Sequence, residues 1–144
     1  MQRVTKSVLV PYAAERMFAL VDDVESYPRF LPWCGGARVL EQRDEGKTAR
    51  LEIDYHGVRA HFTTDTENLP FEKIVITLKD GPFRHLHGEW RFRALAEDAS
   101  KVEFDLNYEF KAHMIESLVG PVFNHIANTF IDAFVRRAEM LYPE

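Results

Sequence analysis

The sequence predicts an α+β fold in which a curved antiparallel sheet of about seven strands surrounds a long C-terminal helix. Several segments alternate apolar and charged residues with a period of two, and two helical patterns precede the second strand. The last third repeats apolar residues every three or four positions. A sheet too long to stay flat curls, and one amphipathic helix can fill its concave side. Because a helix seldom fills that space completely, we expect an apolar pocket between the two.

Length and composition predict one cytoplasmic domain over residues 1–144. The chain has 46% hydrophobic and 28% charged residues, and its one cysteine, Cys34, suits a reducing compartment. No apolar run is long enough for a membrane span, and the first apolar residues are too few for a signal peptide. The formal net charge of −5 counts against a protein that holds nucleic acid through its phosphates, so we expect no DNA partner.

The clearest element is a β-hairpin. Residues 49–55 and 58–63 alternate apolar with charged or polar side chains, and His56 and Gly57 between them have the form of a two-residue turn. The register that keeps the apolar side chains on one face pairs Tyr55 with Val58, Ile53 with Ala60 and Leu51 with Phe62.

Further strands are expected on both sides of this hairpin. The same alternation predicts strands over 74–78, 90–94 and 102–110. Weaker patterns predict strands over about 2–10 and 37–43. Two helical segments are expected before the second strand, over about 13–21 and 24–30. The order of these elements predicts an antiparallel meander with one wet and one dry face.

The last third predicts a long helix with one apolar face. Its members by spacing are Val119, Phe123, Ala127, Phe130, Phe134, Ala138 and Leu141. The opposite face carries His125, Asn128, Asp132, Arg136 and Glu139. Gly120 and Pro121 are expected to break or kink this helix near its start, because proline cannot donate a backbone hydrogen bond.

No pattern in the sequence predicts catalysis or a bound metal. His85 and His87 would point the same way on a strand, but a metal site needs three or four ligands and no acidic partner lies nearby. Cys34 has no recognisable partner histidine, so a packed thiol is its expected role. The dry face carries no charged residue on the four clearest strands, so we expect an uncharged pocket and no proton transfer in it. A non-enzymatic protein that requires no cofactor is therefore expected.

Hydroxyl groups are the polar atoms expected on the inner face. They belong to Tyr55, Thr64, Thr66 and Tyr108. Two interpretations stay open. Either the hydroxyls hydrogen-bond a ligand carbonyl inside the pocket, or they lie at the ends of the sheet and meet water.

Three stretches of the chain form a recognisable series. The first is SYPRFLPWC at 26–34, and the second is DGPFRHLHGEWRF at 80–92. The third is the long helix, with Phe110 before it and AFVRRA at 133–138. In this order, over essentially the whole chain, they resemble the coenzyme Q-binding START-like family. That family includes mitochondrial coenzyme Q-binding proteins and bacterial RatA proteins.

The resemblance implies a helix-grip, START-like fold with a hydrophobic tunnel between sheet and helix. For the mitochondrial members it implies binding of ubiquinone or a related isoprenoid lipid, in support of respiration or quinone biosynthesis. For the RatA proteins it implies association with the large ribosomal subunit, which blocks its joining to the small one. We expect the first function and keep the second as the alternative. Broader relatives are polyketide cyclases, and the resemblance supplies no catalytic residues to carry over.

Two sets of residues are the candidate sites. The hydrophobic cavity is expected to be lined by Tyr27, Phe30, Leu31, Trp33, Tyr55, Phe62, Trp90, Phe92, Leu106, Tyr108, Phe123, Ala127 and Phe130. The candidate ribosome contacts are Lys111, Arg136 and Arg137, because the arginines of 90–94 have acidic neighbours across the strand. The aromatic segment 27–33, which Pro28 and Pro32 stiffen, has three open roles: it lines the pocket mouth, touches the inner membrane peripherally, or packs as core.

Overall fold

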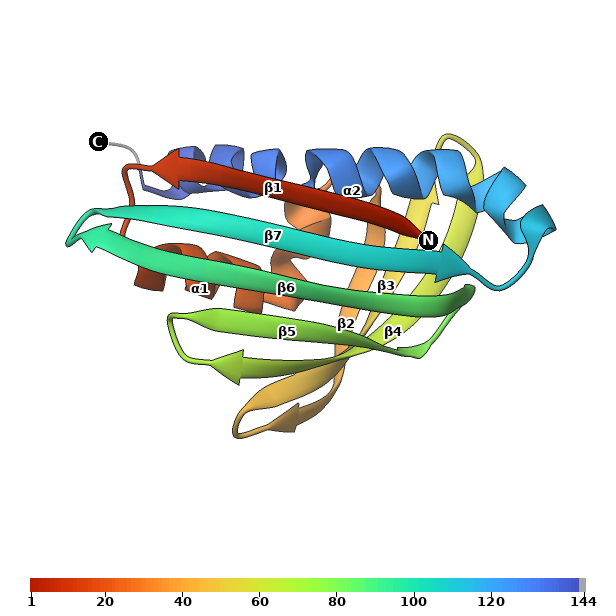
Figure 1. Cartoon of the computed structure of the whole chain (residues 1–144), viewed down its shortest axis with the longest axis horizontal. Coiled ribbons are helices and arrows are strands. Elements are labelled where there is room, and N and C mark those ends of the chain that lie inside the picture. Colours follow the sequence, from red (N-terminus) through yellow and green to blue (C-terminus); the bar gives the residue numbers. More distant parts are fainter. Residues whose placement is uncertain (143–144) are drawn as a thin grey trace.

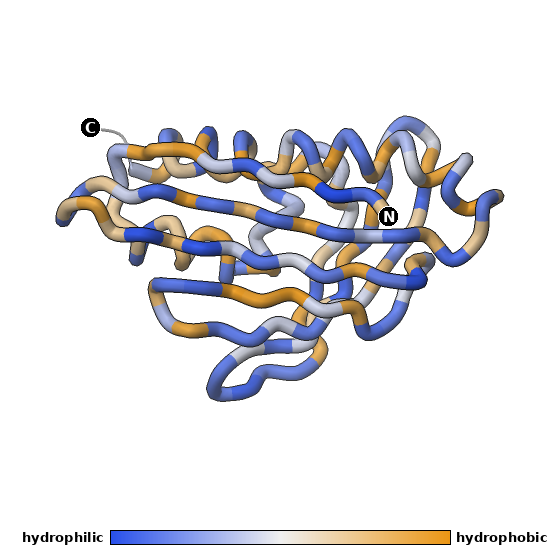
Figure 2. The backbone as a smooth tube through the Cα atoms, viewed as in Figure 1, coloured by the Kyte–Doolittle hydropathy of each residue, from blue (hydrophilic) through white to orange (hydrophobic). Residues whose placement is uncertain are grey.

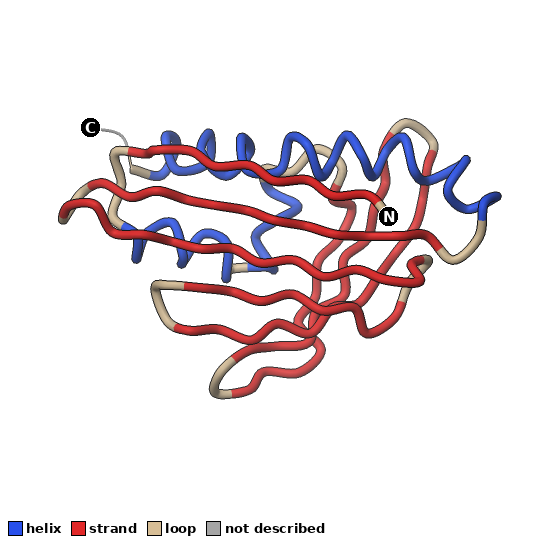
Figure 3. Tube along the Cα trace, in the orientation of Figure 1, coloured by secondary structure: helices blue, strands red, loops and turns tan. Residues whose placement is uncertain are grey.

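The computed structural model describes residues 1–142, so the last two residues of the predicted domain lie outside the described part. Its elements are β1 (Gln2–Val10), α1 (Ala14–Asp22), the 3-10 helix η1 (Val24–Arg29), β2 (Cys34–Arg43), β3 (Gly46–Tyr55), β4 (Val58–Leu69), β5 (Lys73–Asp80), β6 (Phe83–Ala96), β7 (Ala99–Phe110) and α2 (His113–Leu141). Within these residues, seven antiparallel strands form one sheet in the order β1-β7-β6-β5-β4-β3-β2. Both α-helices pass behind the long strands in the view of Figures 1 and 3. The predicted α+β architecture is confirmed.

The β3–β4 hairpin has the predicted register. Tyr55 lies opposite Val58, Ile53 opposite Ala60 and Leu51 opposite Phe62. His56 and Gly57 both have positive φ, 50° and 81°, which is the backbone of a tight turn whose twist matches that of the strands.

Strand β3 begins earlier than the alternation predicts. A Cβ atom on Gly46 would lie 1.8 Å from the carbonyl oxygen of Thr66, so only glycine lets the two strands approach this closely. The pairing therefore extends back to Gly46, and it brings Lys47 opposite Thr66. This extension adds a residue to the inner face that the sequence pattern did not predict.

The core lies between the concave side of the sheet and the helices. Figure 2 shows hydrophobic and hydrophilic residues alternating along the long strands. On β7, every second residue from Ser100 to Phe110 is buried, while those between are partly exposed. On α2, Phe123 and Phe134 are buried as predicted, and Ile126 and Ile131 are buried beside them.

Two expectations for α2 are corrected. Of the break or kink expected near Gly120 and Pro121, the break is absent, because the helix runs from His113 to Leu141. Pro121 lies on the exposed side, where water can satisfy the carbonyl group that loses its partner. Leu141 is 45% exposed rather than buried, because the helix ends there and the following Tyr142 packs against Tyr12.

No helix within residues 1–142 combines the length and apolar character needed to cross a membrane.

Candidate functional site

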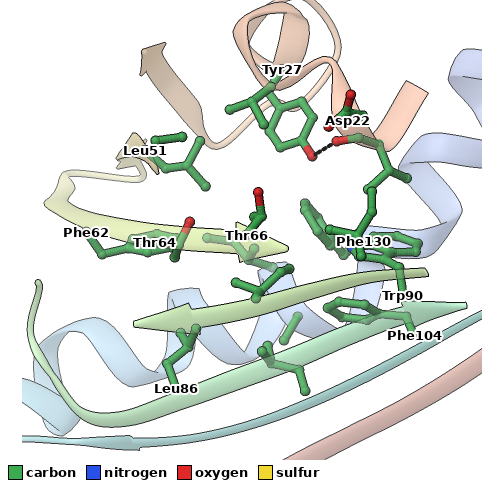
Figure 4. Close-up of a pocket in the computed structure, with 18 of the residues that line it drawn as sticks. Asp22, Tyr27, Leu51, Phe62, Thr64, Thr66, Leu86, Trp90, Phe104 and Phe130 are labelled. Carbon is green, nitrogen blue, oxygen red and sulfur yellow. Dashed lines mark hydrogen bonds between the residues drawn. The ribbon is translucent and has the colours of Figure 1, made fainter. Parts of the chain in front are cut away.

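A cavity of about 80 Å³ lies between the sheet and α2 (Figure 4). Its lining from the sheet and the segment before it is Trp33, Lys47, Ala49, Leu51, Phe62, Thr64, Thr66, Ile74, Ile76, Leu86, Trp90, Phe104 and Leu106. The helices contribute Val21, Asp22, Val24, Tyr27, Phe123, Ile126, Ala127 and Phe130. The wall is therefore mostly apolar and aromatic, which is typical of sites that hold small apolar molecules.

The structure brings together most of the residues predicted for a cavity. Tyr27, Trp33, Phe62, Trp90, Leu106, Phe123, Ala127 and Phe130 all line it. Phe130 is central to the aromatic wall, since its ring lies 5.7 Å from that of Trp90 and 5.5 Å from that of Phe104.

The remaining predicted residues lie outside the lining, namely Phe30, Leu31, Tyr55, Phe92 and Tyr108. Leu31 and Phe92 are buried in the surrounding core. Phe30 packs edge-on against Phe134 of α2, and Tyr55 stacks on His125. The hydroxyl of Tyr108 donates a hydrogen bond to the side-chain oxygen of Asn124. Tyr55 and Tyr108 therefore do not supply hydroxyl groups to this cavity.

The aromatic segment 27–33 packs as core and also contributes to the cavity wall. Tyr27 and Trp33 are each 5% exposed and line the cavity from one side. The Tyr27 hydroxyl donates a 2.5 Å hydrogen bond to the carbonyl of Val21, which ties η1 to the end of α1. Burial, with the nearby Asp22 charge, raises the pKa of this hydroxyl well above its ordinary value, so it stays protonated.

One end of the cavity is charged, which corrects the expectation of an uncharged pocket. Lys47 is 7% exposed, and its Nζ lies 3.1 Å from Oδ1 of Asp22 and donates to the Asp22 carbonyl oxygen at 2.6 Å. The same carboxylate accepts a 2.9 Å hydrogen bond from Asn68. The prediction failed because it started β3 at residue 49. Counting back two residues from Ala49 would have placed Lys47 on the inner face.

Two threonines of β4 also line the cavity: Thr66 lies opposite Lys47, and Thr64 is two residues farther from the charged end (Figure 4). The Thr66 hydroxyl is already occupied, because it accepts from the backbone nitrogen of Lys47 at 3.2 Å and donates to its carbonyl oxygen at 3.3 Å. Thr64 lies opposite Ala49 and is 5% exposed. Its hydroxyl forms no hydrogen bond with another residue within 1–142, and it is not among the enclosed polar atoms that lack a partner, so it is open to the cavity. We call Asp22, Lys47 and Thr66 the polar end of the cavity.

The residues considered for catalysis or metal binding are placed as follows. Burial raises the pKa of the Cys34 thiol to about 11, and the thiol donates to the Gly36 carbonyl oxygen at 3.3 Å. Cys34 therefore carries a neutral thiol near neutral pH rather than the reactive thiolate. Among residues 1–142, no three His, Cys, Asp or Glu side chains, His85 and His87 included, are grouped so as to hold a metal ion.

The candidate ribosome contacts lie at two separate places. Arg136 and Arg137 are near the C-terminal end of α2, whereas Lys111 precedes its first residue. At 1.5 Å per residue they are about 37 Å apart, so the three cannot form one patch.

Other arginines accompany the C-terminal pair. The Arg137 guanidinium lies 5.1 Å from the ring centre of Phe30, which follows Arg29, and Arg16 lies 4.6 Å from the ring centre of Tyr142. No ion pair of Arg16, Arg29, Arg136 or Arg137 is formed within residues 1–142. We call these four residues the arginine end.

Comparison with known proteins identifies the family that has this architecture. The family described as polyketide cyclase / dehydrase and lipid transport matches residues 10–135, which include most of the sheet, both walls of the cavity and nearly all of α2. The chain belongs to the polyketide cyclase/START-like family. The Zhui aromatase/cyclase of a Streptomyces species superposes with a TM-score of 0.79 over 96% of this chain and 93% of that one. At 22% identity, this likeness to an aromatase/cyclase supports the fold alone.

Sequence relatives place the chain within the polyketide cyclase/START-like family. It is 43% identical over 144 residues to the ribosome association toxin RatA of Vibrio cholerae, covering 100% of both chains. A mitochondrial coenzyme Q-binding protein of Xenopus laevis is 26% identical over 142 residues, covering 96% of this chain and 58% of that protein. The chain is therefore a RatA-type member of the family, and the coenzyme Q-binding relative is more distant.

Proposed function

We propose that this protein associates with the ribosome, as the name of its RatA relatives states for them. The observation that carries the proposal is the 43% identity to such a relative over the full length of both chains. The large subunit is the expected target, and blocked joining of the subunits is the expected result, because the family resemblance implies both. This choice reverses the order of the two functions expected from the sequence.

The arginine end is the surface that suits this function. Ribosomal RNA is recognised mainly through its phosphates, and a protein of net charge −5 needs a local group of unpaired cations to approach it. Arg136 is exposed on α2, and Arg137 is partly held by the ring of Phe30. Lys111, at the other end of α2, is a separate candidate contact.

Sedimentation through sucrose gradients with purified subunits tests the proposal. The wild-type protein should travel with the large subunit at low salt and leave it as the salt concentration rises. The double variant Arg136→Glu, Arg137→Glu should no longer co-sediment. Arg59→Glu, Lys79→Glu is the matched control, since it changes the net charge equally on other exposed strand positions. Absence of wild-type co-sedimentation, or equal loss in both variants, would contradict the proposal.

A second function is favoured by the cavity itself: the protein holds a small apolar molecule, of which ubiquinone or a related isoprenoid is the expected kind. The cavity volume of about 80 Å³ accommodates a ring or a short branched chain, so a longer tail must extend outside or widen the cavity. Mass spectrometry of organic extracts from natively purified protein tests this function. The variant Phe130→Trp, whose larger side chain fills the cavity, should yield less of the same compound. A ligand-free extract from the wild type would count against the binding of an apolar molecule.

A further inference from the structure

The unpartnered hydroxyl of Thr64 is the starting point. Buried hydroxyl groups in folded proteins nearly always have a hydrogen-bond partner, because an unsatisfied one loses its hydration without compensation. Thr64 is 5% exposed and lines the cavity, and its hydroxyl, which is open to the cavity, forms no hydrogen bond with another residue within 1–142 (Figure 4). Its neighbour Thr66 differs, because its hydroxyl is fully engaged with the backbone of Lys47.

The Lys47 ammonium group lies at the polar end of the cavity, beside Asp22. Lys47 is opposite Thr66 and Thr64 is opposite Ala49, so Lys47 and Thr64 occupy diagonal positions on neighbouring strands. The ammonium has three donors, of which Asp22 takes two through its carboxylate and its carbonyl oxygen. The Lys47 ammonium is thus largely engaged, whereas no residue within 1–142 engages the Thr64 hydroxyl, which is therefore the donor that an oxygen acceptor on a ligand would meet.

The charge of the site decides which acceptor suits it. Asp22 already neutralises Lys47, so a second carboxylate entering the cavity would find no unpaired cation and would lose its hydration. A carbonyl oxygen accepts a hydrogen bond without carrying a charge, and the rest of the wall is apolar. We propose that the Thr64 hydroxyl, on the cavity wall next to the polar end, donates a hydrogen bond to the carbonyl oxygen of an uncharged, otherwise apolar molecule. This inference rests on the second proposed function, the binding of an apolar molecule.

Three small probes of nearly the same shape test the inference: acetophenone, ethylbenzene and benzoate. The first two differ by one carbonyl oxygen, and the third carries a charge. Dissociation constants are measured by NMR titration for the wild type and for Thr64→Val, which replaces the hydroxyl by a methyl group of similar size. We expect Thr64→Val to weaken acetophenone by about five- to tenfold, the effect of one hydrogen bond, and to leave ethylbenzene unchanged or tighter. Thr64→Ser should restore acetophenone binding, and benzoate should bind the wild type least.

The melting temperature without ligand supplies an independent readout. Thr64→Val removes a hydroxyl that has no partner, so it should leave the melting temperature unchanged or raise it, whereas Thr66→Val removes two hydrogen bonds and should lower it. Equal effects of Thr64→Val on acetophenone and ethylbenzene, or tighter binding of benzoate than acetophenone, would overturn the carbonyl site and leave apolar binding intact. If neither acetophenone nor ethylbenzene binds the wild type, the proposed ligand-binding function fails together with the inference.

Discussion

Lys47 of β3 and Asp22 at the end of α1 form an ion pair in which the two partners are unequally buried. The lysine side chain is 8% exposed, while the aspartate side chain is 34% exposed. The pair joins the first helix to the middle of the chain and closes one end of the cavity. If Lys47 is removed, water can therefore solvate the Asp22 carboxylate. If Asp22 is removed, water cannot solvate the buried Lys47 ammonium group in the same way.

This asymmetry predicts which partner matters more for stability. Asp22→Asn leaves a buried ammonium group without its counter-charge and should cost about 3 kcal/mol, whereas Lys47→Met leaves a carboxylate that water reaches and should cost about 1 kcal/mol. Urea unfolding of the two variants measures the difference. A larger loss of unfolding free energy for Lys47→Met than for Asp22→Asn would show that water reaches Lys47 better than Asp22.

The hydroxyl of Tyr27 should stabilise the junction between α1 and η1. Tyr27→Phe leaves the buried Val21 carbonyl without its donor and should cost about 1–3 kcal/mol of unfolding free energy. Tyr12→Phe is the matched control, because the Tyr12 hydroxyl forms no side-chain hydrogen bond within residues 1–142. Equal urea midpoints for the two variants would contradict the role given to the Tyr27 hydroxyl.

Two phenylalanines of α2 should differ in the cost of truncation. Phe134 is fully buried, so Phe134→Ala should cost about 3–5 kcal/mol, while Phe130 borders the cavity and is only partly buried, so Phe130→Ala should cost noticeably less. Denaturant unfolding of both variants provides the comparison. The assignment of Phe130 to the cavity wall fails if the two losses are the same.

The Cys34 thiol should make stability depend on alkaline pH. Its pKa is about 11 in the folded chain, above its ordinary value, because burial disfavours the thiolate. Above the ordinary thiol pKa the unfolded chain loses this proton and the folded chain keeps it, so the stabilisation from this group is lost as the pH rises through about 9 to 11.

Urea midpoints across that range, for the wild type and Cys34→Ala, isolate this contribution. Burial also raises the pKa of Tyr27 and Tyr108, so both chains should lose stability with rising pH. The wild type should lose more. Parallel curves would mean that the thiol is accessible to water.

The sequence predicted the strands and the helix face around the cavity better than it predicted which side chains line the cavity. The pairing of Leu51 with Phe62 follows from alternation alone, because a shift by one residue would expose both side chains. Periodicity also gave the face of α2 that carries Phe130. It did not distinguish Phe92, which packs in the solid core, from Trp90, which borders the cavity, because that difference depends on where the helix leaves space.

The polar end was missed for a different reason. A lysine just before an apolar strand is typical of a loop. The residues around Lys47 do not indicate that Asp22, at the end of a helix, neutralises it. Such a pair depends on a contact between distant elements, which period and composition do not encode. The glycine at position 46, which permits the close approach to Thr66, was the one local signal.

The first strand has no neighbour that is close in sequence. β1 pairs only with β7, with Val4 opposite Leu106, and the helix α2 that also contacts it comes later still. During synthesis, the backbone groups of β1 therefore stay unpaired until nearly the whole chain has emerged. Contacts between residues so distant in sequence raise the contact order and slow folding. Until β7 is present, the unpaired β1 can also mispair with other chains. The completion of the sheet, rather than of any helix, should therefore set the pace at which new copies of this protein mature.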